Sequence, residues 1–281
     1  MKRRSPLEKL PVIDVWAQPA LIEGLKKIPE VMRLFEQSGS SALLKRGLNT
    51  EETLALMDQA GISKLMLAAW SRPGTWIFSN EQIAEMVQAH PDRFSGVASV
   101  NLENPVQAVK ELEHAVKEWS FKALRIVPWL WKLPPNDKLY YPLYVKCIEL
   151  EIPFCTQAGH TGPLMPSETG RPVPYLDEVA LTFPDLKIVA GHIGYPWTQE
   201  MIGLAWKHPN VFIDTSAYLP RYYPQELIHF MKTYGQDKVL FGTNFPQLPF
   251  DKAVKQVEDL DLSQEVKEKF LFKNAKRIFK V

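Results

Sequence analysis

Short apolar runs rich in β-branched residues alternate along this chain with longer segments whose apolar residues recur at helical spacing. The runs that predict strands are Val12–Trp16, Lys64–Trp70, Phe94–Val100, Ala123–Val127, Pro153–Gln157, Lys187–Ala190, Val211–Thr215 and Val239–Gly242. The segments that predict helices are Thr50–Ala60, Asn80–His90, Val106–Trp119, Leu139–Leu150, Tyr175–Phe183, Thr198–Trp206, Gln225–Tyr234 and Lys252–Leu260. Strands that alternate with helices of about 10–15 residues are typical of parallel βαβ units, and eight such units make a (β/α)8 barrel.

Signals at the segment boundaries fit this interpretation. Asn49 precedes the helix Thr50–Ala60 as an N-cap followed by acidic residues, and Gly61 comes directly after it as a stop. A further helix is predicted from Ser263 to the carboxyl end. Since no repeat, linker or low-complexity segment divides the chain, we predict an α/β fold. In it, residues 1–281 form one (β/α)8 TIM barrel with an extra C-terminal helix.

Composition excludes several classes of partner. The 33 Lys and Arg residues balance 32 Asp and Glu residues, for a net charge of +1, and no basic block stands out. Nucleic acids and anionic membranes are therefore not expected as partners. The basic stretch 1–6 is not followed by an apolar run, so no signal peptide is expected. The two cysteines, Cys147 and Cys155, lie in apolar stretches and are interpreted as reduced core thiols of a cytoplasmic protein.

Candidate chemistry is sought where the predicted strands end, because functional side chains of such barrels lie at the carboxyl ends of the strands. The polar and aromatic residues at those ends are Asp14, Trp16, Gln18, Trp70, Arg125, Trp129, Trp131, Gln157, His160, His192, Asp214, Ser216, Thr243 and Asn244. The other four histidines, His90, His114, His208 and His229, fall on helices or before proline and are assigned structural roles. The proline-rich segment Pro163–Pro174 is expected to form a flap over one mouth of the barrel.

Several of these segments resemble one family. Val12-Ile13-Asp14 opens the first strand, and Gly159-His160-Thr161-Gly162 follows the fifth. Gly191-His192-Ile193-Gly194-Tyr195-Pro196-Trp197 and Leu240-Phe241-Gly242-Thr243-Asn244-Phe245-Pro246 are the most specific matches. Over nearly its whole length, the chain resembles the amidohydrolase-2 group, which includes aminocarboxymuconate-semialdehyde decarboxylase and the resorcylate-type decarboxylases. The resemblance implies a barrel with metal-assisted hydrolase or decarboxylase chemistry, and homodimers are common in the group.

The sequence departs from that family where the metal is bound. The family's first strand carries Asp-x-His-x-His, but Trp16 and Gln18 stand at the two histidine positions. The family's carboxylate on the eighth strand aligns with Asn244, so only His160 survives among the usual ligands. An indole N–H is a donor only and cannot ligate, and neutral amides are poor ligands for zinc. No cofactor is therefore expected, although His160 and His192 are candidates for holding zinc or manganese weakly.

The enzyme hypothesis that follows places a small-molecule substrate beside His192, which the resemblance gives as a proton donor or acceptor. His160 and Asp214 complete the candidate catalytic set, with Asp214 orienting a histidine. The candidate substrate-binding residues are Arg125 for a carboxylate, Gln18 and Asn244 as hydrogen-bond donors, and Trp16, Trp70, Trp129 and Tyr195 as walls. The predicted reaction is proton transfer on a small cyclic or aromatic carboxylate or lactone, by hydrolysis, decarboxylation or hydration.

Other interpretations stay open from the sequence. In a structural interpretation, Trp16 is a core side chain that fills the space of the metal. Arg125 then forms a buried ion pair with Asp14 or Asp214. A second hypothesis is that the whole chain is a non-catalytic ligand-binding or scaffold protein. A third hypothesis keeps a metal-dependent hydrolase whose ligands are rearranged, for instance His160, His192 and Asp214.

Overall fold

The computed structural model describes residues 10–281, so the predicted absence of a signal peptide at residues 1–6 lies outside the described part. Eight parallel strands form one sheet in the order β1-β2-β5-β6-β7-β8-β9-β10. They are β1 (Val12–Ala17), β2 (Ile62–Ala68), β5 (Phe94–Ala98), β6 (Ala123–Ile126), β7 (Phe154–Gln157), β8 (Ile188–Gly191), β9 (Val211–Asp214) and β10 (Val239–Leu240).

The sheet curls until its first and last strands meet. The Val15 N–H donates to the Phe241 carbonyl at 3.0 Å, and the Asn244 N–H donates to the Trp16 carbonyl at 2.8 Å. Ala17 also pairs with Phe245 in the parallel sense. These bonds bring the two ends of the sheet together, and the predicted α/β barrel class is confirmed.

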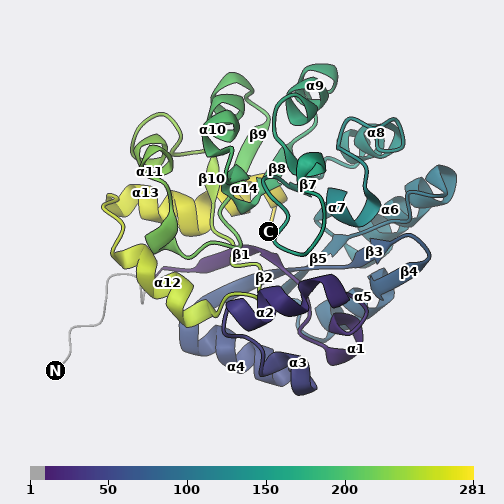
Figure 1. The fold of residues 1–281 in the computed structure, drawn as a ribbon, viewed down its shortest axis with the longest axis horizontal. Helices are drawn as coiled ribbons and strands as arrows, with labels where there is room; N and C mark the ends of the chain where they lie inside the picture. The colour runs from purple at the N-terminus through teal and green to yellow at the C-terminus, as the bar shows by residue number, and fades with distance from the viewer. Residues whose placement is uncertain (1–9) are drawn as a thin grey trace.

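The helices form a layer around the strands (Figure 1). The outer helices are α4 (Thr50–Ala60), α5 (Asn80–Ala89), α6 (Pro105–Trp119), α8 (Tyr141–Glu149), α9 (Tyr175–Thr182), α10 (Thr198–Lys207), α11 (Gln225–Lys232) and α12 (Phe250–Glu258). The predicted cap of α4 is confirmed, because Asn49 accepts the Glu52 N–H while the Glu52 side chain accepts the Asn49 N–H. Gly61 ends this helix in a left-handed conformation, which costs glycine little.

The strands are apolar on both faces because each face packs against a different layer. On β2, Leu65 and Leu67 join the core beneath the helices, whereas Met66 and Ala68 join a second cluster inside the barrel. This alternation is the two-residue period of a strand. Both cysteines are buried and free, as predicted.

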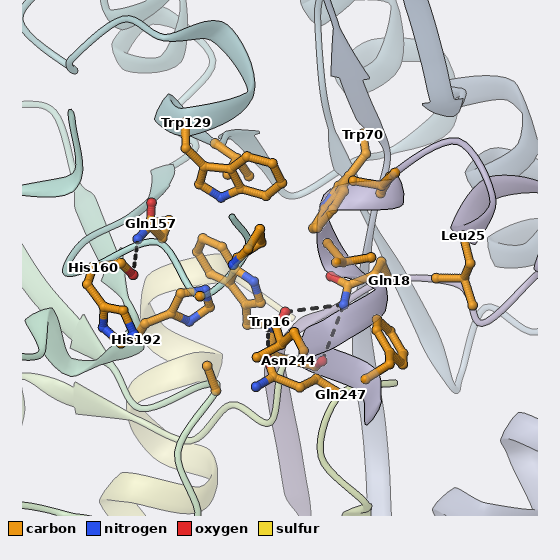
Figure 2. A pocket seen from close by; sticks show the side chains of 18 of the residues that line it. Trp16, Gln18, Leu25, Trp70, Trp129, Gln157, His160, His192, Asn244 and Gln247 are labelled. Atoms are coloured by element: carbon orange, nitrogen blue, oxygen red, sulfur yellow. Dashed lines mark hydrogen bonds between the residues drawn. The ribbon is translucent and has the colours of Figure 1, made fainter. Parts of the chain in front are cut away.

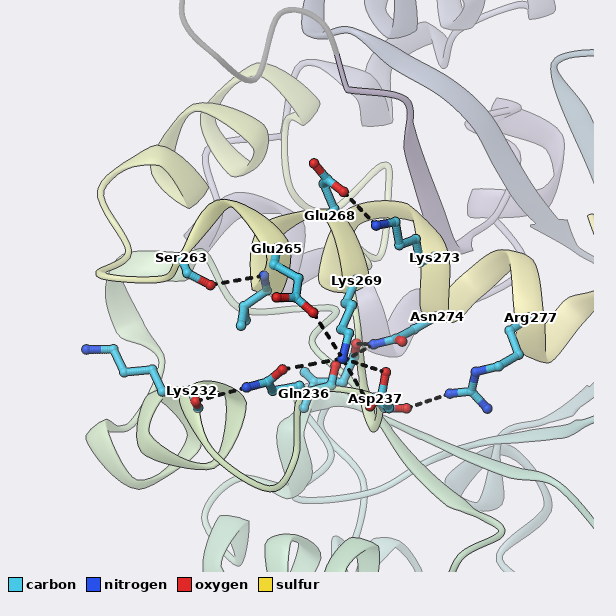
Figure 3. Close-up of polar contacts among 12 residues, drawn as sticks. Lys232, Gln236, Asp237, Ser263, Glu265, Glu268, Lys269, Lys273, Asn274 and Arg277 are labelled. Carbon is cyan, nitrogen blue, oxygen red and sulfur yellow. Dashed lines mark hydrogen bonds and ion pairs between the residues drawn. The ribbon is translucent and has the colours of Figure 1, made fainter.

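The predicted C-terminal helix is continuous but contains a π-helical turn. It consists of α13 (Gln264–Glu268), the π turn η6 (Lys269–Lys273) and α14 (Asn274–Phe279). Ile278 and Phe279 join the cluster inside the barrel, so this helix closes one end of it. Figure 3 shows its polar contacts with the segment before β10, where the Asn274 side chain donates to the Gln236 and Val239 carbonyls at 2.9 Å each.

Several short elements were not predicted. The connection from β1 to α4 contains α1 (Ile22–Leu25), η2 (Pro29–Val31), α2 (Met32–Gln37) and α3 (Leu43–Arg46). A hairpin of β3 (Trp70–Arg72) and β4 (Thr75–Phe78) follows β2, and α7 (Pro128–Trp131) follows β6. Single turns occur at η3 (Glu168–Gly170), η4 (His192–Gly194) and η5 (Pro220–Tyr222). These pieces lie in the connections between strands and helices, where they add to the barrel without altering its order.

Within residues 10–281, no helix combines the length and apolar character needed to span a bilayer.

A buried carboxylate stabilises the seam where the barrel closes. Asp14 on β1 is fully buried, and its Oδ1 accepts the backbone N–H groups of Trp16 and Thr243 at 3.1 Å each. Its Oδ2 accepts the Thr243 hydroxyl, which in turn accepts the Phe245 N–H at 3.0 Å. Asp14 therefore acts as a structural residue that ties the first strand to the segment after the last.

We predict that Thr243→Val lowers the free energy of unfolding by about 2–3 kcal/mol, because a buried charged acceptor loses its donor. Thr243→Ser keeps the hydroxyl and is expected to lose less than about 1 kcal/mol. Urea unfolding of the two variants beside the natural protein measures the difference. Equal losses in the two variants would show that the hydroxyl contributes nothing to the seam.

Candidate active site

A cavity of about 220 Å³ opens at the carboxyl ends of the strands. Its polar lining consists of imidazoles, carboxamides, indoles and one phenol, and its apolar lining comes largely from the connection between β1 and α4. The lining residues are Trp16, Gln18, Leu25, Ile28, Val31, Leu34, Phe35, Trp70, Phe78, Val127, Trp129, Gln157, His160, Gly162, Pro163, His192, Ala217, Tyr218, Asn244 and Gln247. Because a cavity of about 150 Å³ accommodates benzene, this one has room for a substituted single ring.

The lining contains two of the three candidate catalytic residues and most of the predicted walls. His160 and His192 both line the cavity, and Trp16, Trp70 and Trp129 stand around it (Figure 2). Among the described residues that line it, none is Lys, Arg, Asp or Glu. A bound molecule therefore meets aromatic faces and neutral polar groups in this cavity, without a charged side chain.

His192 begins the turn after β8, with a positive φ of 70° that directs its imidazole toward the cavity. Its Nδ1 lies 2.7 Å from the Ser216 hydroxyl, which donates to Asp214 Oδ2 at 2.7 Å. Burial and then the charge of Arg125 lower the pKa of His192 to about 3. The imidazole is therefore neutral at physiological pH, and Asp214, the predicted orienting residue, contacts Ser216 and not the imidazole itself.

Trp16 occupies the floor of the cavity. Its side chain is 1% exposed, and its ring lies at 5.1 Å from the His192 ring in an edge-on arrangement. A Cβ on Gly191 would approach the indole to 2.8 Å, so the ring needs glycine at that position. The indole Nε1 is buried and has no hydrogen-bond partner among residues 10–281.

Arg125 lies behind this indole and does not line the cavity, which corrects its predicted role in gripping a substrate carboxylate. Its guanidinium carbon is 4.4 Å from the centroid of the Trp16 ring, and the residue is 2% exposed. Its Nη2 donates to the Ala17 carbonyl at 2.6 Å. No ion pair joins Arg125 to Asp14 or Asp214 within the described residues, contrary to the alternative, and the two carboxylates attract it only from a longer distance.

The carboxamides of Gln18 and Asn244 are not free donors, contrary to prediction. Gln18 Nε2 donates to the Phe245 carbonyl at 2.6 Å and lies 3.2 Å from Asn244 Oδ1. Asn244 Nδ2 donates to Gln247 Oε1 at 2.7 Å. The group that Gln18 leaves without a partner is instead its acceptor, Oε1, and the same holds for Gln157 Oε1.

The remaining candidates lie at the rim. His160 is exposed, with Nδ1 at 3.3 Å from both the Tyr195 carbonyl and the Tyr218 hydroxyl. Tyr195 is 47% exposed and packs against the His160 ring from outside the lining, which corrects its predicted place as a wall. Of the predicted flap, Pro163–Pro174, only Pro163 lines the cavity, together with Gly162 just before it.

Sequence reasoning missed the apolar cover of the cavity. Leu25, Ile28, Val31 and Leu34 recur at intervals of three residues in the connection after β1. That spacing places apolar side chains on one side of a helical segment, so the pattern contained a signal for a packed lid.

The donor set does not fit a tightly held divalent metal. Within residues 10–281, no group of three or more His, Cys, Asp or Glu side chains is arranged to hold an ion. The indole of Trp16, at a position where the resemblance implies a ligand, cannot ligate a metal, and the guanidinium of Arg125 stacked behind it would repel a cation. The resemblance puts Gln18 and Asn244 at the other two positions, and their neutral amide oxygens are poor ligands for zinc even where, as for Gln18 Oε1, the oxygen has no hydrogen-bond partner.

Comparison with known proteins agrees with this architecture. The amidohydrolase family matches residues 14–281, which is nearly the whole chain. The chain belongs to the amidohydrolase family. The chain is 25% identical to γ-resorcylate decarboxylase of Polaromonas sp., over 82% of its own length and 87% of the relative. It is 27% identical to 2-keto-4-carboxy-3-hexenedioate hydratase of Sphingobium sp., over 71% and 70%.

Two solved structures show the same fold. A TIM-barrel protein of Bordetella bronchiseptica superposes with a TM-score of 0.84 at 25% identity, covering 96% of this amidohydrolase and 99% of that chain. A 2,6-dihydroxybenzoate decarboxylase from Rhizobium superposes with a TM-score of 0.72 at 21% identity, covering 96% and 99%. The relatives are enzymes, and decarboxylases recur among them.

The lowered pKa of His192 predicts a pH dependence of stability. Folded protein binds fewer protons at His192 than unfolded protein between about pH 3 and about pH 6.5, so this residue destabilises the fold as pH falls through that window. Relative to the natural protein, His192→Gln should gain stability at acid pH, by at most about 1.4 kcal/mol per pH unit.

Urea unfolding between about pH 4.5 and about pH 7 measures this difference. Burial raises the pKa of Asp14 and Asp214 to about 7, so both carboxyls contribute in the opposite direction; the contribution of Asp14, which has no bond to His192, is present in both proteins and cancels in the comparison. His229→Gln, on the exposed face of α11, is the matched histidine replacement. The prediction is contradicted if the difference in unfolding free energy between His192→Gln and the natural protein is the same at every pH.

Proposed function

We propose that this amidohydrolase removes a carboxylate from a small ring compound as CO₂, with His192 moving the proton and without a divalent metal. The observation that carries the proposal is the position of His192, whose Nδ1 is bonded to Ser216 while its ring lines the cavity. That arrangement leaves Nε2 as the ring nitrogen available to a bound molecule. Decarboxylase chemistry is supported by the relatives, which include decarboxylases of γ-resorcylate and of 2-amino-3-carboxymuconate-6-semialdehyde.

The shape of the cavity supports a ring substrate. Trp16, Trp70 and Trp129 present three indoles around about 220 Å³, and Trp70 and Trp129 meet edge to face at 6.5 Å. Aromatic side chains favour the edge or face of another ring, so a flat single-ring molecule has favourable contacts on several sides. A hydroxylated ring acid, the kind of molecule that the names of the relatives describe, has these dimensions.

The uncharged lining supports loss of the carboxylate. A ring acid carries a localised charge, whereas the transition state of decarboxylation spreads that charge into the ring. A cavity without a cation disfavours the localised charge more than the dispersed one, which lowers the barrier between them. The buried indole N–H groups of Trp16 and Trp70 have no hydrogen-bond partner among residues 10–281.

The neutral imidazole has a lone pair on Nε2 that can accept a proton, and a bound anion raises the low pKa of His192 by offsetting the charge of Arg125. In the proposed reaction, Nε2 takes the proton of a ring hydroxyl and returns it to the ring carbon that bears the carboxylate. The bond between that carbon and the carboxylate then breaks, its electron pair returns to the ring, and CO₂ leaves. Overall, the acid anion and one proton from solvent give the neutral ring and CO₂.

Hydrolysis of a small lactone is the second candidate, and one observation favours it. An uncharged cavity accepts an uncharged ester more readily than an anion, and a neutral imidazole with a free Nε2 can take a proton from water. The products distinguish the two reactions, since a lactone gives a hydroxy acid without CO₂.

A panel of hydroxybenzoates and lactones, followed by CO₂ release and by acid production, tests the proposal. We predict that His192→Gln lowers kcat by about 10²–10⁴-fold, which is the usual contribution of a general acid or base. The dissociation constant of a ring compound, followed through the fluorescence of the cavity tryptophans, should change less than about threefold, because the indoles around the cavity are unchanged.

His229→Gln is the control and should keep full turnover. Turnover of His192→Gln equal to that of the natural protein would remove His192 from the mechanism. Ring binding without turnover of any substrate in the panel would favour the non-catalytic hypothesis instead.

A further inference from the structure

We infer that Ser216 is a positioning residue, which links Asp214 to His192 and thereby fixes the proton of the imidazole on Nδ1. The inference deepens the proposed function and rests on it for the role of His192. It adds that His192 meets the substrate as a proton acceptor, with an unprotonated Nε2.

The three side chains form a continuous line of hydrogen bonds. Asp214 Oδ2 accepts the Ser216 hydroxyl at 2.7 Å, and Asp214 Oδ1 accepts the Ser216 backbone N–H at 2.9 Å. The Ser216 hydroxyl oxygen lies 2.7 Å from His192 Nδ1. Asp214 is not bonded to the imidazole itself, so any influence of the carboxylate on proton position passes through Ser216.

The direction of these bonds follows from counting protons. A serine hydroxyl has one proton and can accept through its lone pairs. When Asp214 is a carboxylate it can only accept, so it takes the Ser216 proton. The Ser216 oxygen must then accept from His192, which requires the proton on Nδ1 and leaves Nε2 as an acceptor.

Neighbouring residues bury this line of hydrogen bonds and hold it in place. Ser216 and Asp214 are fully buried, so Ser216 acts through His192 and does not itself face the substrate. A Cβ on Gly242 would lie 2.2 Å from Asp214 Oδ1 and 3.1 Å from the Ser216 Cβ, so only glycine leaves room for the pair. Thr215 between them is fixed by bonds from its N–H and its hydroxyl to the Leu240 carbonyl at 3.1 Å each.

The direction of these hydrogen bonds depends on whether Asp214 is ionised, and nearby charged groups influence its pKa. Burial, with a smaller contribution from Asp14, raises its pKa to about 7 against the lowering effect of the two donors from Ser216 and of Arg125. The carboxylate form prevails above that value. The proton position is therefore measured at about pH 8.5, well above it.

The test is the ¹⁵N NMR spectrum of protein labelled at histidine nitrogens, with the His192 signals assigned by their loss in His192→Gln. The natural protein should show a protonated Nδ1 and an unprotonated Nε2. Ser216→Thr keeps a hydroxyl and should give the same pattern, whereas Ser216→Ala should give a mixture of the two tautomers.

Asp214→Asn is the more discriminating variant, because it should reverse donor and acceptor in both hydrogen bonds of the Ser216 hydroxyl. The new amide keeps an acceptor for the Ser216 N–H but presents N–H to the Ser216 oxygen, so the hydroxyl must donate to His192 Nδ1. The proton then moves to Nε2. An Nε2-protonated natural protein, or unchanged spectra in both Ser216→Ala and Asp214→Asn, would overturn the inference.

Turnover provides a second reading. Ser216→Ala should lower kcat at least about tenfold with KM within about threefold, and Ser216→Thr should restore most of it. The spectra do not depend on knowing the substrate. A failure of the proposed reaction with the predicted spectra leaves the tautomer assignment standing, whereas reversed spectra contradict it whatever the reaction.

Discussion

The site depends on one stacked pair, the indole of Trp16 on the guanidinium of Arg125. A cation this deeply buried needs compensation, and it finds it in the ring at 4.4 Å, the Ala17 carbonyl and the nearby charges of Asp14 and Asp214. Contacts of this kind contribute about 2 kcal/mol when removed from water. The indole of this pair stands at the position where the family resemblance implies a metal-binding histidine.

The rest of the chemistry follows from that pair. Burial, together with the positive charge behind the indole, lowers the pKa of His192 and keeps its imidazole neutral, so one ring nitrogen retains a free lone pair. Ser216 and Asp214 hold its Nδ1, and the cavity in front of it contains aromatic rings and carboxamides without a charged side chain. Small residues make the arrangement sterically feasible, with Gly191 beneath the indole and Gly242 beside Asp214.

The sequence predicted the barrel because its signals are local. Alternating runs, the Asn49 cap and the Gly61 stop depend on neighbours along the chain, and α4 has the predicted bounds. Even β10, shorter than predicted, has its place in the order, since Val239 and Leu240 pair with β9 and the following residues bond to β1 irregularly. The predicted strand ends also placed His192, Trp16 and Asp214 at the same end of the barrel.

Partners of long polar side chains could not be read from the sequence in the same way. Arg125 was expected to face a substrate, yet the carbonyl that it bonds lies 108 positions away along the chain. The amide nitrogen of Gln18 is taken by the Phe245 carbonyl, 227 positions away, and only the folded geometry shows that its oxygen is the free atom. Such choices depend on distances between strands of the closed barrel, which residue order does not encode.

The most direct measurement of the central claim is the metal content of protein produced in medium supplemented with zinc and manganese. Elemental analysis after purification, followed by turnover before and after treatment with a chelator, compares the metal with the activity. The account predicts far less than one ion per chain and unchanged turnover after chelation. One ion per chain, whose removal abolishes turnover and whose return restores it, would contradict the account.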